Sequence, residues 1–299
     1  MATLVVPNIS EGRDRETIGN SVNSVESEGM SVLDVHSDVH HNRTVLTLSG
    51  PAACVPGAMV ALARSLDHVD LRRHDGVHPR MGRLDVCPVV SMRPTATSTS
   101  AAVELARATG RAIAAPCDLP VYFYGDAAVR PGTRSLAAIR RGGLKTLKVR
   151  ATDELPPDIG PPRVDLSRGV VCVGARRPMI AFNVWLEGGA AAARRIASRV
   201  RTTNGGPIGV LALGWELPNT PHSQVSMNLI EPDRTGIGDA FDAVAREALA
   251  EDVAIAGTEV VGMVPERLIP SPAAEVSQLF MTPVRSLDEA LRRLDETVD

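Results

Sequence analysis

The sequence feature that most restricts the folding of this chain is the polar stretch at residues 73–82, which reads Arg-His-Asp-Gly-Val-His-Pro-Arg-Met-Gly. Two imidazoles, two guanidinium groups and a carboxylate so close together cannot lie in a buried strand, because these groups would lose their water. Gly76, Pro79 and Gly82 exclude the interior of a regular helix. The stretch therefore predicts a loop, followed by a strand that begins near Asp85. Loops held on a rigid scaffold are a common place for chemistry.

Apolar periodicity on both sides of this loop predicts alternating strands and helices. The predicted strands cover residues 3–6, 31–36, 43–50, 85–91 and 119–124 in the first half, and 170–173, 180–185, 208–215, 223–230 and 252–261 in the second. The predicted helices lie around residues 18–25, 52–67, 99–114, 189–203, 238–250 and 287–294. The stretch 126–168 has few apolar residues in phase, and its proline-rich part at 156–162 predicts an extended connector.

This alternation indicates α/β layering, in which helices cover a sheet. The 299 residues are enough for two compact units. We place the boundary near residue 176, so that residues 1–176 form an N-terminal subdomain and residues 177–299 a C-terminal one.

Composition argues against several classes of function. A net charge of -3 and 3% aromatic residues predict no nucleic-acid partner, because such partners need basic surfaces and stacking side chains. The four cysteines lie far apart without a CxxC pair, which favours reduced core residues over a disulfide framework or a zinc site. The chain shows no signal-peptide pattern and no apolar run long enough to span a bilayer, so we expect a cytoplasmic protein with no membrane partner.

His78, with Arg80 two residues on, is the first candidate for chemistry. An imidazole has a reference pKa of about 6.5, which suits it to proton transfer near neutral pH. The alternative is a histidine that only forms hydrogen bonds within a structural loop. His74 lies four residues earlier, but Gly76 and Pro79 deny this pair the helical geometry of HExxH metal sites.

A second candidate is the run Asp34, His36, Asp38 and His40, whose side chains would share one face of a strand. Two carboxylates and two imidazoles on one face could bind zinc, iron or manganese in a metal-dependent hydrolase. A polar strand end that faces solvent or a cleft is the competing interpretation, and we favour it over a metal site. A GxG pattern at residues 236–238 opens a predicted helix, but without a third glycine it favours a capped turn over a dinucleotide site.

Several motifs, in order along residues 4–268, resemble the glutamate formimidoyltransferase (formiminotransferase) family in a stand-alone form without the cyclodeaminase domain. The most specific are Val-Pro-Asn-Ile-Ser-Glu-Gly at residues 6–12 and His-Pro-Arg-Met-Gly at residues 78–82. Further matching segments lie at residues 41–45, 84–88, 120–122, 139–142, 158–161, 173–176, 224–229 and 261–265.

The resemblance implies a folate-dependent transferase that moves a formimino group between N-formimino-L-glutamate and N5 of tetrahydrofolate, in one-carbon metabolism and histidine degradation. It implies an α/β (α+β) fold of two βα subdomains, each a mixed β-sheet covered by helices, with a ligand groove between them. It also implies a homodimer, tetrahydrofolate as co-substrate and no metal.

The family's catalytic histidine falls on His78, as general acid/base. The implied folate contacts are Gly160, Pro161, Pro162, Arg163, Val164, Asp165, Leu166, Ser167, Arg168, Gly169, Arg199, Val200 and Arg201. The predicted substrate contacts are Asn8, His36, Asn42, Arg43 and Arg80.

The residue chemistry is consistent with this reaction. One imidazole between two nitrogens can take a proton from N5 and give one to the departing amino group, which is worth about 10²–10⁴-fold in rate. Arginines bind carboxylates well through paired hydrogen bonds. The arginines considered for this role are Arg43, Arg80, Arg163 and Arg201.

The chain departs from the family pattern at His36 and His40, where acidic residues are usual, and at Arg168, where an aromatic residue is common. If a carboxylate orients the catalytic histidine in the family, we expect one of the two neighbouring aspartates or another group to do so here. Two alternatives therefore stay open. One is a related formimidoyltransferase with another amino-acid or specialised-metabolite substrate, for example glycine, and the other is a non-catalytic folate-binding protein.

Overall fold

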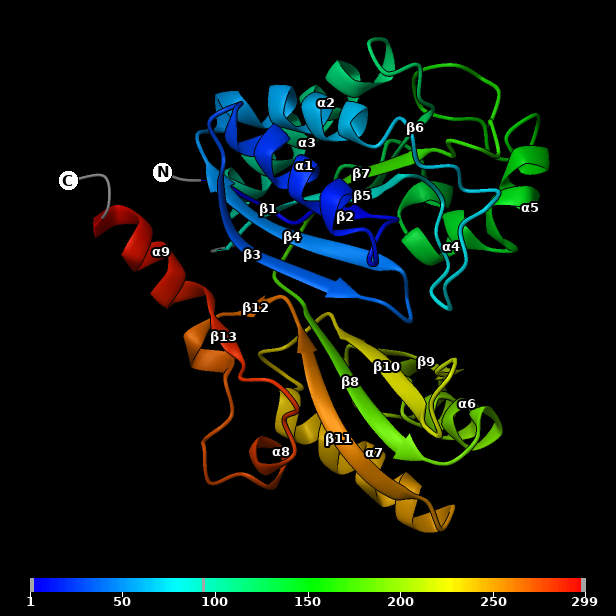
Figure 1. The fold of residues 1–299 in the computed structure, drawn as a ribbon, viewed down its shortest axis with the longest axis vertical. Helices are drawn as coiled ribbons and strands as arrows, with labels where there is room; N and C mark the ends of the chain where they lie inside the picture. The colour runs from blue at the N-terminus through cyan, green and yellow to red at the C-terminus, as the bar shows by residue number, and fades with distance from the viewer. Residues whose placement is uncertain (1–2, 93–94, 297–299) are drawn as a thin grey trace. The chain divides into compact units, whose positions relative to one another are not determined.

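The computed structural model of the chain describes residues 3–92 and 95–296. It divides into two compact units, unit 1 at residues 1–177 and unit 2 at residues 178–299 (Figure 1). Each unit has its own main sheet, helices packed on that sheet, and an apolar core. The predicted α/β fold class is thus confirmed. No helix among the described residues is long and apolar enough to cross a membrane.

Unit 1 is built on one seven-stranded sheet. Its strands are β1 Thr3–Val5, β2 Asn8–Ile9, β3 Ser31–Asp38, β4 Arg43–Gly50, β5 Leu84–Val90, β6 Val121–Gly125 and β7 Val171–Arg176. β3 pairs with β4, while β1 and β2 each pair with both β4 and β5, and β7 and β6 follow β5. β5, β7 and β6 run parallel, and the other pairs are antiparallel.

Three helices cover one face of this sheet (Figure 1). They are α1 Arg15–Glu26, α2 Val55–Ser65 and α3 Ala96–Ala114. The carboxylate of Asp14 starts α1 by accepting the backbone N–H of Glu16, as N-cap residues do. Fully buried members of the core between sheet and helices include Leu46, Leu48, Met59 and Leu62. Each such side chain stabilises the fold by about 1.5–3 kcal/mol through burial.

A segment without a helix prediction covers the opposite face of β5, β6 and β7. Residues 126–168 contain two short helices in addition to the predicted extended connector. They are α4 Leu136–Arg140 and α5 Gly143–Arg150. They bury Ile139 and Leu147 in one apolar cluster with Tyr122 of β6. The sequence pattern does not predict these two helices, because helices of five and eight residues are too short for apolar periodicity to show.

Unit 2 has a four-stranded antiparallel sheet in the order β11, β8, β10, β9. Its strands are β8 Ile180–Glu187, β9 Val210–Glu216, β10 Ser223–Leu229 and β11 Ala254–Val261. Two helices, α6 Ala190–Arg199 and α7 Ile237–Ala250, bury their apolar residues in one core with these strands. The C-terminal part adds α8 Glu275–Gln278, the parallel pair β12 Met263–Val264 and β13 Arg285–Ser286, and α9 Leu287–Glu296. Short 3₁₀ helices lie in both units. Those of unit 1 are η1 Ala52–Cys54 and η2 Pro131–Thr133, and those of unit 2 are η3 Thr202–Asn204 and η4 Glu266–Leu268.

The close approach of two backbone segments beside the polar loop generates a stability test. Gly82 pairs with Gly169 in an isolated β-bridge, and a Cβ atom on Gly82 would lie 1.9 Å from the carbonyl oxygen of Val170. We expect Gly82→Ala to lower the free energy of unfolding by about 1–3 kcal/mol, because the backbone must shift to admit the methyl group. Urea unfolding followed by circular dichroism measures the change.

Gly19→Ala is the matched control for this substitution. Gly19 lies on α1, and apart from its chain neighbours and the backbone of its own helix, no atom of the described residues lies within 4 Å of the position that its Cβ would take. Alanine is the better helix former, so we expect a gain of about 1 kcal/mol in the free energy of unfolding. Equal effects of the two substitutions would contradict the close contact at Gly82.

Candidate active site

His78 lies in the loop between α2 and β5, and its ring is bound by a cation. The Nε2 atom of His78 is 2.9 Å from Nη1 of Arg43, the first residue of β4. A guanidinium group only donates hydrogen bonds, so Nε2 accepts and the neutral ring carries its proton on Nδ1. Part of the His78 residue reaches solvent, but its Nδ1 atom is buried. The ring of His41 lies 5.8 Å away between centroids.

The surroundings favour the neutral form of His78. Burial lowers the pKa of His78 well below 6.5, and the charges of Arg43 and Arg140 and the nearby His41 lower it further. The ring is therefore an unprotonated base at neutral pH. Its available lone pair is the one that Arg43 engages.

Arg43 is itself held by the neighbouring strand. Its Nη2 atom donates to the side-chain oxygen of Asn8, the first residue of β2. The strand register explains this contact, since Asn8 lies opposite Val45, two residues along β4 from Arg43. Burial, followed by the charge of Arg140, lowers the pKa of Arg43 to about 10, so the side chain remains a cation at neutral pH.

A buried ion pair completes this group of residues. Arg140 of α4 pairs with one carboxylate oxygen of Asp85 on β5, and the other oxygen accepts the N–H of Met81 at 2.6 Å. The side chain of Asp85 is 2% exposed and that of Arg140 17% exposed. Two guanidinium groups and one carboxylate thus lie around a neutral imidazole and leave an excess of positive charge. We call this set the His78 cluster; its members are His78, Arg43, Asn8, Arg140 and Asp85.

The same hydrogen bonds show what the sequence prediction missed. Arg140, Asp85 and His41 were not among the predicted site residues. They lie inside the segments 139–142, 84–88 and 41–45 that carry the family resemblance, which is the signal that could have found them. A matching segment does not tell which of its side chains point to the site.

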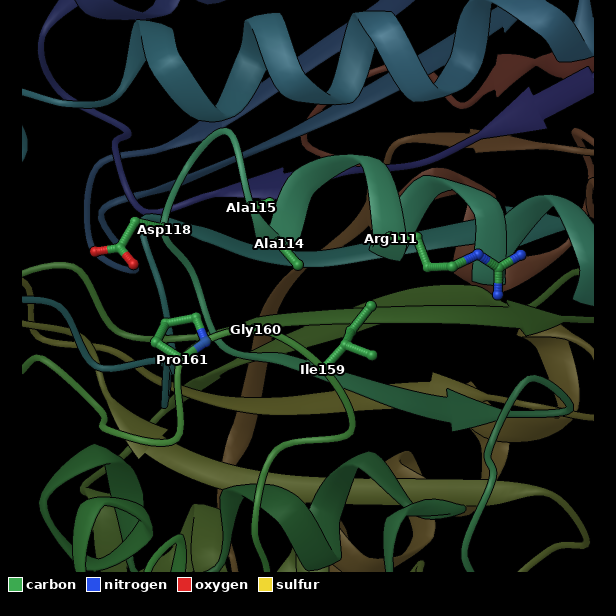
Figure 2. Close-up of a pocket in the computed structure, with 7 residues that line it drawn as sticks. All are labelled: Arg111, Ala114, Ala115, Asp118, Ile159, Gly160 and Pro161. Carbon is green, nitrogen blue, oxygen red and sulfur yellow. The ribbon is translucent and has the colours of Figure 1, made fainter.

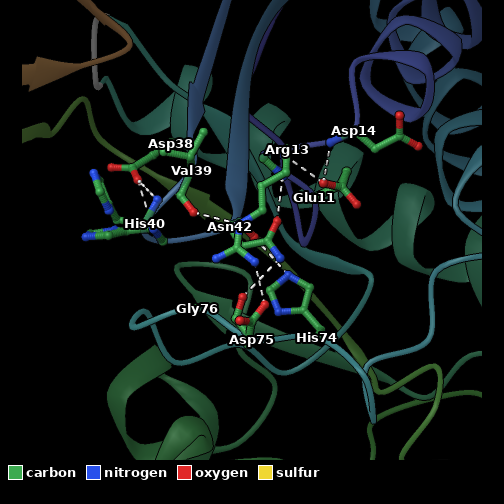
Figure 3. A network of polar contacts seen from close by, with 12 residues as sticks. Glu11, Arg13, Asp14, Asp38, Val39, His40, Asn42, His74, Asp75 and Gly76 are labelled. Carbon is green, nitrogen blue, oxygen red and sulfur yellow. Dashed lines mark hydrogen bonds and ion pairs between the residues drawn. The ribbon is translucent and has the colours of Figure 1, made fainter. Parts of the chain in front are cut away.

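Three loops are joined beside the cluster (Figure 3). Asn42, with a φ of 46°, accepts the N–H of Gly12 at 2.9 Å and donates to the carbonyl of Asp75 at 3.0 Å. Asparagine is one of the few residues that adopt a positive φ readily. The Nε2 atom of His74 donates to the carbonyl of Asn42 at 2.8 Å. His74 therefore supports the loop, and His78 is the histidine bonded to a guanidinium group.

Arg80 and His36, two predicted substrate contacts, lie outside the His78 cluster. Arg80 donates from Nη2 to the carbonyls of Gly76 at 2.6 Å and of His78 at 2.9 Å, so it closes the turn that presents His78. Burial lowers the pKa of Arg80. His36 lies on β3 directly opposite Val45 of β4 and is partly buried.

The end of β3 corrects the idea of four ligands on one strand face. Asp34, His36 and Asp38 alternate along β3, but the strand ends at Asp38 and His40 lies in the following turn. One carboxylate oxygen of Asp38 accepts the backbone N–H groups of His40 and His41, at 2.7 and 2.8 Å. Within residues 3–92 and 95–296, no group of three or more His, Cys, Asp or Glu side chains is placed to hold a metal ion.

The predicted folate segment lines a hollow of about 470 Å³, which we call the connector hollow. Its lining residues are Asp118, Leu119, Pro120, Lys148, Thr152, Pro161, Pro162, Arg163, Val164, Asp165, Arg168 and Gly169. Backbone bonds attach this segment to the polar loop: the N–H of Val170 donates to Met81 at 2.8 Å, and that of Arg83 donates to Arg168 at 3.2 Å. The guanidinium of Arg168 also pairs with Asp118 at 3.2 Å.

A second hollow, of about 450 Å³, shares Asp118 and Pro161 with the connector hollow (Figure 2). Its other lining residues are Arg111, Ala114, Ala115, Ile159 and Gly160. Figure 2 shows the last turns of α3 on one side of this hollow and the connector on the other. His78 is absent from both linings, so a ligand that fills either hollow needs a further part to reach the His78 cluster.

The predicted folate contacts in unit 2 take part in the structure of that unit. Arg199 forms ion pairs with Glu247 of α7, at 2.5 Å, and with Glu251, the C-cap residue of α7. Val200 is buried in the core of unit 2. The Nε atom of Arg201 donates to a backbone carbonyl of β9 at 2.7 Å. Their contact with folate stays a prediction.

The chain is an α/β protein with two helix-covered sheets, and the first of its units holds a neutral histidine among guanidinium groups. Residues 2–176 match the N-terminal subdomain of the formiminotransferase domain, and residues 181–281 match the formiminotransferase domain. The chain therefore belongs to the formiminotransferase family, which confirms the resemblance seen in the sequence.

Particular relatives include enzymes of similar length. The chain is 33% identical to the glutamate formimidoyltransferase of Streptococcus pyogenes serotype M1, over 90% of this chain and 91% of the relative. It is 34% identical to that of Thermoplasma acidophilum, over 88% of each chain. It is also 37% identical to the formimidoyltransferase-cyclodeaminase of Sus scrofa, over 94% of this chain but 54% of the relative, so it spans about half of that protein.

The buried carboxylate of Asp85 provides a test of what stabilises the His78 cluster. Asp85→Asn keeps an oxygen for the N–H of Met81 but removes the negative charge beside Arg140. We expect the free energy of unfolding to fall by about 3 kcal/mol, because a largely buried cation is then uncompensated. Asp67→Asn is the control: Asp67 is 65% exposed in its pair with Arg83, and the change should cost less than about 1 kcal/mol. Equal losses in urea unfolding would contradict the role of Asp85.

Proposed function

We propose that this protein moves a formimino group between N-formimino-L-glutamate and N5 of tetrahydrofolate, with His78 as general acid/base. The observation that carries the proposal is the neutral His78 bonded to Arg43 and close to a second guanidinium group. Such a site offers a base for proton transfer and cations for substrates that carry carboxylates. The names of the relatives from Streptococcus pyogenes and Thermoplasma acidophilum support the same reaction.

His78 acts first as a base and then as an acid. N5 of tetrahydrofolate attacks the amidine carbon of the donor, and Nε2 takes the N5 proton as the new N–C bond forms. The tetrahedral intermediate collapses when the C–N bond to the glutamate nitrogen breaks, and His78 returns the proton to that nitrogen. A positioned acid/base supplies about 10²–10⁴-fold in rate. Holding both substrates in one site supplies a further share, because the attack becomes effectively unimolecular.

The connector hollow binds the glutamate tail of folate in this proposal. Its lining offers Lys148, Arg163 and Arg168, whose cationic groups suit the carboxylates of that tail. The lining is bonded through its backbone to the loop that carries His78. The pteridine then extends from the hollow toward His78.

The donor binds at the His78 cluster in this proposal. Asn8, Arg43 and His36 lie on the neighbouring strands β2, β4 and β3, and they contact the donor together with Asn42 and Arg80. Glutamate is the donor's amino acid. A donor built on glycine would use the same groups, and a folate-binding protein without turnover would use only the connector hollow.

We also propose that the protein acts on small-molecule substrates as a homodimer in the cytoplasm. Tetrahydrofolate is a co-substrate in this scheme, since it leaves the site changed at N5. The proposed chemistry needs no metal ion, because each proton transfer runs through His78.

Turnover by a His78→Ala variant tests the assignment. The protein is mixed with tetrahydrofolate and N-formimino-glutamate, then with N-formimino-glycine, and 5-formimino-tetrahydrofolate is followed by absorbance. We expect His78→Ala to lower kcat by about 10²–10⁴-fold, while the Kd for tetrahydrofolate, measured by calorimetry, changes little. The control is His68→Ala, since His68 contacts Thr17 at 2.6 Å and is not a member of the His78 cluster.

Each outcome of this assay decides between the proposed reaction, a transferase with another donor and a folate-binding protein without turnover. Product from neither donor would reject a transferase and leave a folate-binding protein. Product from the glycine donor alone would replace glutamate as the substrate. Unchanged turnover in His78→Ala would reject the acid/base role of that residue.

Two lysines on one helix test the place of the folate tail. Lys148 lines the connector hollow, whereas Lys145, on the same exposed part of α5, does not. We expect Lys148→Ala to weaken tetrahydrofolate binding about 3–5-fold, because an exposed contact between a cation and a carboxylate is worth up to about 1 kcal/mol. Lys145→Ala should leave the Kd unchanged in calorimetric titration. The same effect for both lysines would show that the folate tail does not bind in the connector hollow.

A further inference from the structure

The hydrogen bond between Arg43 and His78 occupies the ring nitrogen that a general base needs. Nε2 accepts from Nη1 of Arg43 at 2.9 Å, so the neutral ring keeps its proton on Nδ1. Nε2 is therefore the ring nitrogen with the lone pair, and that lone pair points at a guanidinium N–H. His78 cannot take a proton at Nε2 while Arg43 stays bonded there.

We propose that Arg43 is a positioning residue that keeps His78 inactive until the carboxylate of the formimino donor draws the guanidinium away from Nε2. The inference rests on the proposed function, because it concerns the donor of that reaction. It adds a condition to the reaction: the carboxylate of the donor, and not only its amidine, makes the base available. A donor without a carboxylate meets a histidine whose lone pair is still occupied.

The contacts of Arg43 make it available to such a ligand. Its hydrogen-bond partners are two neutral groups, the ring of His78 and the side-chain amide of Asn8. Its Nε atom is buried and has no hydrogen-bond partner among the described residues. Arg140, by contrast, is already paired with the carboxylate of Asp85. A carboxylate binds a guanidinium through two parallel, charge-assisted hydrogen bonds, so it competes well against neutral acceptors.

Release of Arg43 also makes His78 a stronger base. After burial, the charge of Arg43 is the largest cause that lowers the pKa of His78. A carboxylate bound to Arg43 offsets this charge and so raises the pKa when the ring must take a proton. The other charged or titratable groups around the pair are Arg140 on α4, His41 in the β3–β4 turn, Arg80 in the loop, Asp85 on β5, Asp38 on β3 and Tyr124 on β6.

Formamidine, an amidine without a carboxylate, separates the two parts of the donor. Its transfer forms the same bond to N5, breaks one C–N bond, and passes the N5 proton through Nε2 to the ammonia that leaves. We expect the wild-type kcat/KM for N-formimino-glutamate to exceed that for formamidine by about 100-fold or more. Acetate, a free carboxylate, should raise wild-type turnover of formamidine several-fold, because it binds Arg43 in place of the donor's own carboxylate.

The Arg43→Met variant decides between release and simple binding. We expect formamidine turnover to rise and acetate to lose its effect, while turnover of N-formimino-glutamate falls. If formamidine turnover stays the same or falls, Arg43 only binds the donor or supports the fold, and the proposal is overturned. Arg134→Met is the matched control, because Arg134 is a 76% exposed arginine of unit 1, and it should keep the wild-type response to both donors and to acetate.

Nitrogen NMR of protein with labelled histidines reports the tautomer and the protonation state of the His78 ring without any turnover. The His78 signal, assigned with His78→Ala, should show the Nδ1–H tautomer and stay neutral at about pH 6, and acetate should shift its Nε2 resonance. In Arg43→Met, the His78 ring should titrate at a higher pH and its Nε2 resonance should not change with acetate. In Arg43→Lys, which keeps the charge, the pKa of His78 should stay lowered.

An Nε2–H tautomer in the wild type, or an unchanged pKa in Arg43→Met, would overturn the role of Arg43. Because these spectra need no folate, the two proposals fail separately. Absence of transfer from every donor rejects the proposed function, while the spectra still decide whether Arg43 controls the ring.

Discussion

One carboxylate at the start of a buried strand holds the site together. Asp85 is the second residue of β5, a strand whose residues are all buried, and a charge there is tolerated only when it is paired. Its two oxygens hold the N–H of Met81 and the guanidinium of Arg140, so the loop, the sheet and α4 meet at this side chain. The same pairing keeps a positive charge close to His78, where it favours the neutral ring.

The elements that the sequence predicted best are those with a long, one-sided apolar pattern. The strand predicted at 43–50 is β4, and the helix predicted at 99–114 is α3 with one further turn at its start. α4 and α5 were missed because isolated helices of that length are marginal, and their stability comes from burying residues such as Ile139 and Leu147 against the sheet. Local sequence does not contain that contact.

Prediction of the site from the sequence has the same limit. His78, Arg43 and Asn8 were named through the family resemblance, and the structure joins them by hydrogen bonds. The partner that the structure gives to Nε2 of His78 is a guanidinium, whereas the sequence favoured the two neighbouring aspartates and left another group open. Asp85 and Arg140 stand 55 residues apart in the sequence, so no spacing rule connects them. The four-residue strand face failed for a related reason, since periodicity shows which residues alternate but not where a strand ends.

A base surrounded by cations meets two opposing demands. It must stay unprotonated before the reaction, which the charges near His78 ensure, and it must then bind a proton well, which the same charges oppose. A general base works best when its pKa lies near the operating pH. A fixed cation would therefore cost catalytic power, whereas a cation held by neutral partners can be neutralised by the substrate itself. Arg43, bonded to an imidazole and an amide, has that property, and Arg140, paired with Asp85, does not. The difference between these two arginines lets substrate binding and proton affinity change together.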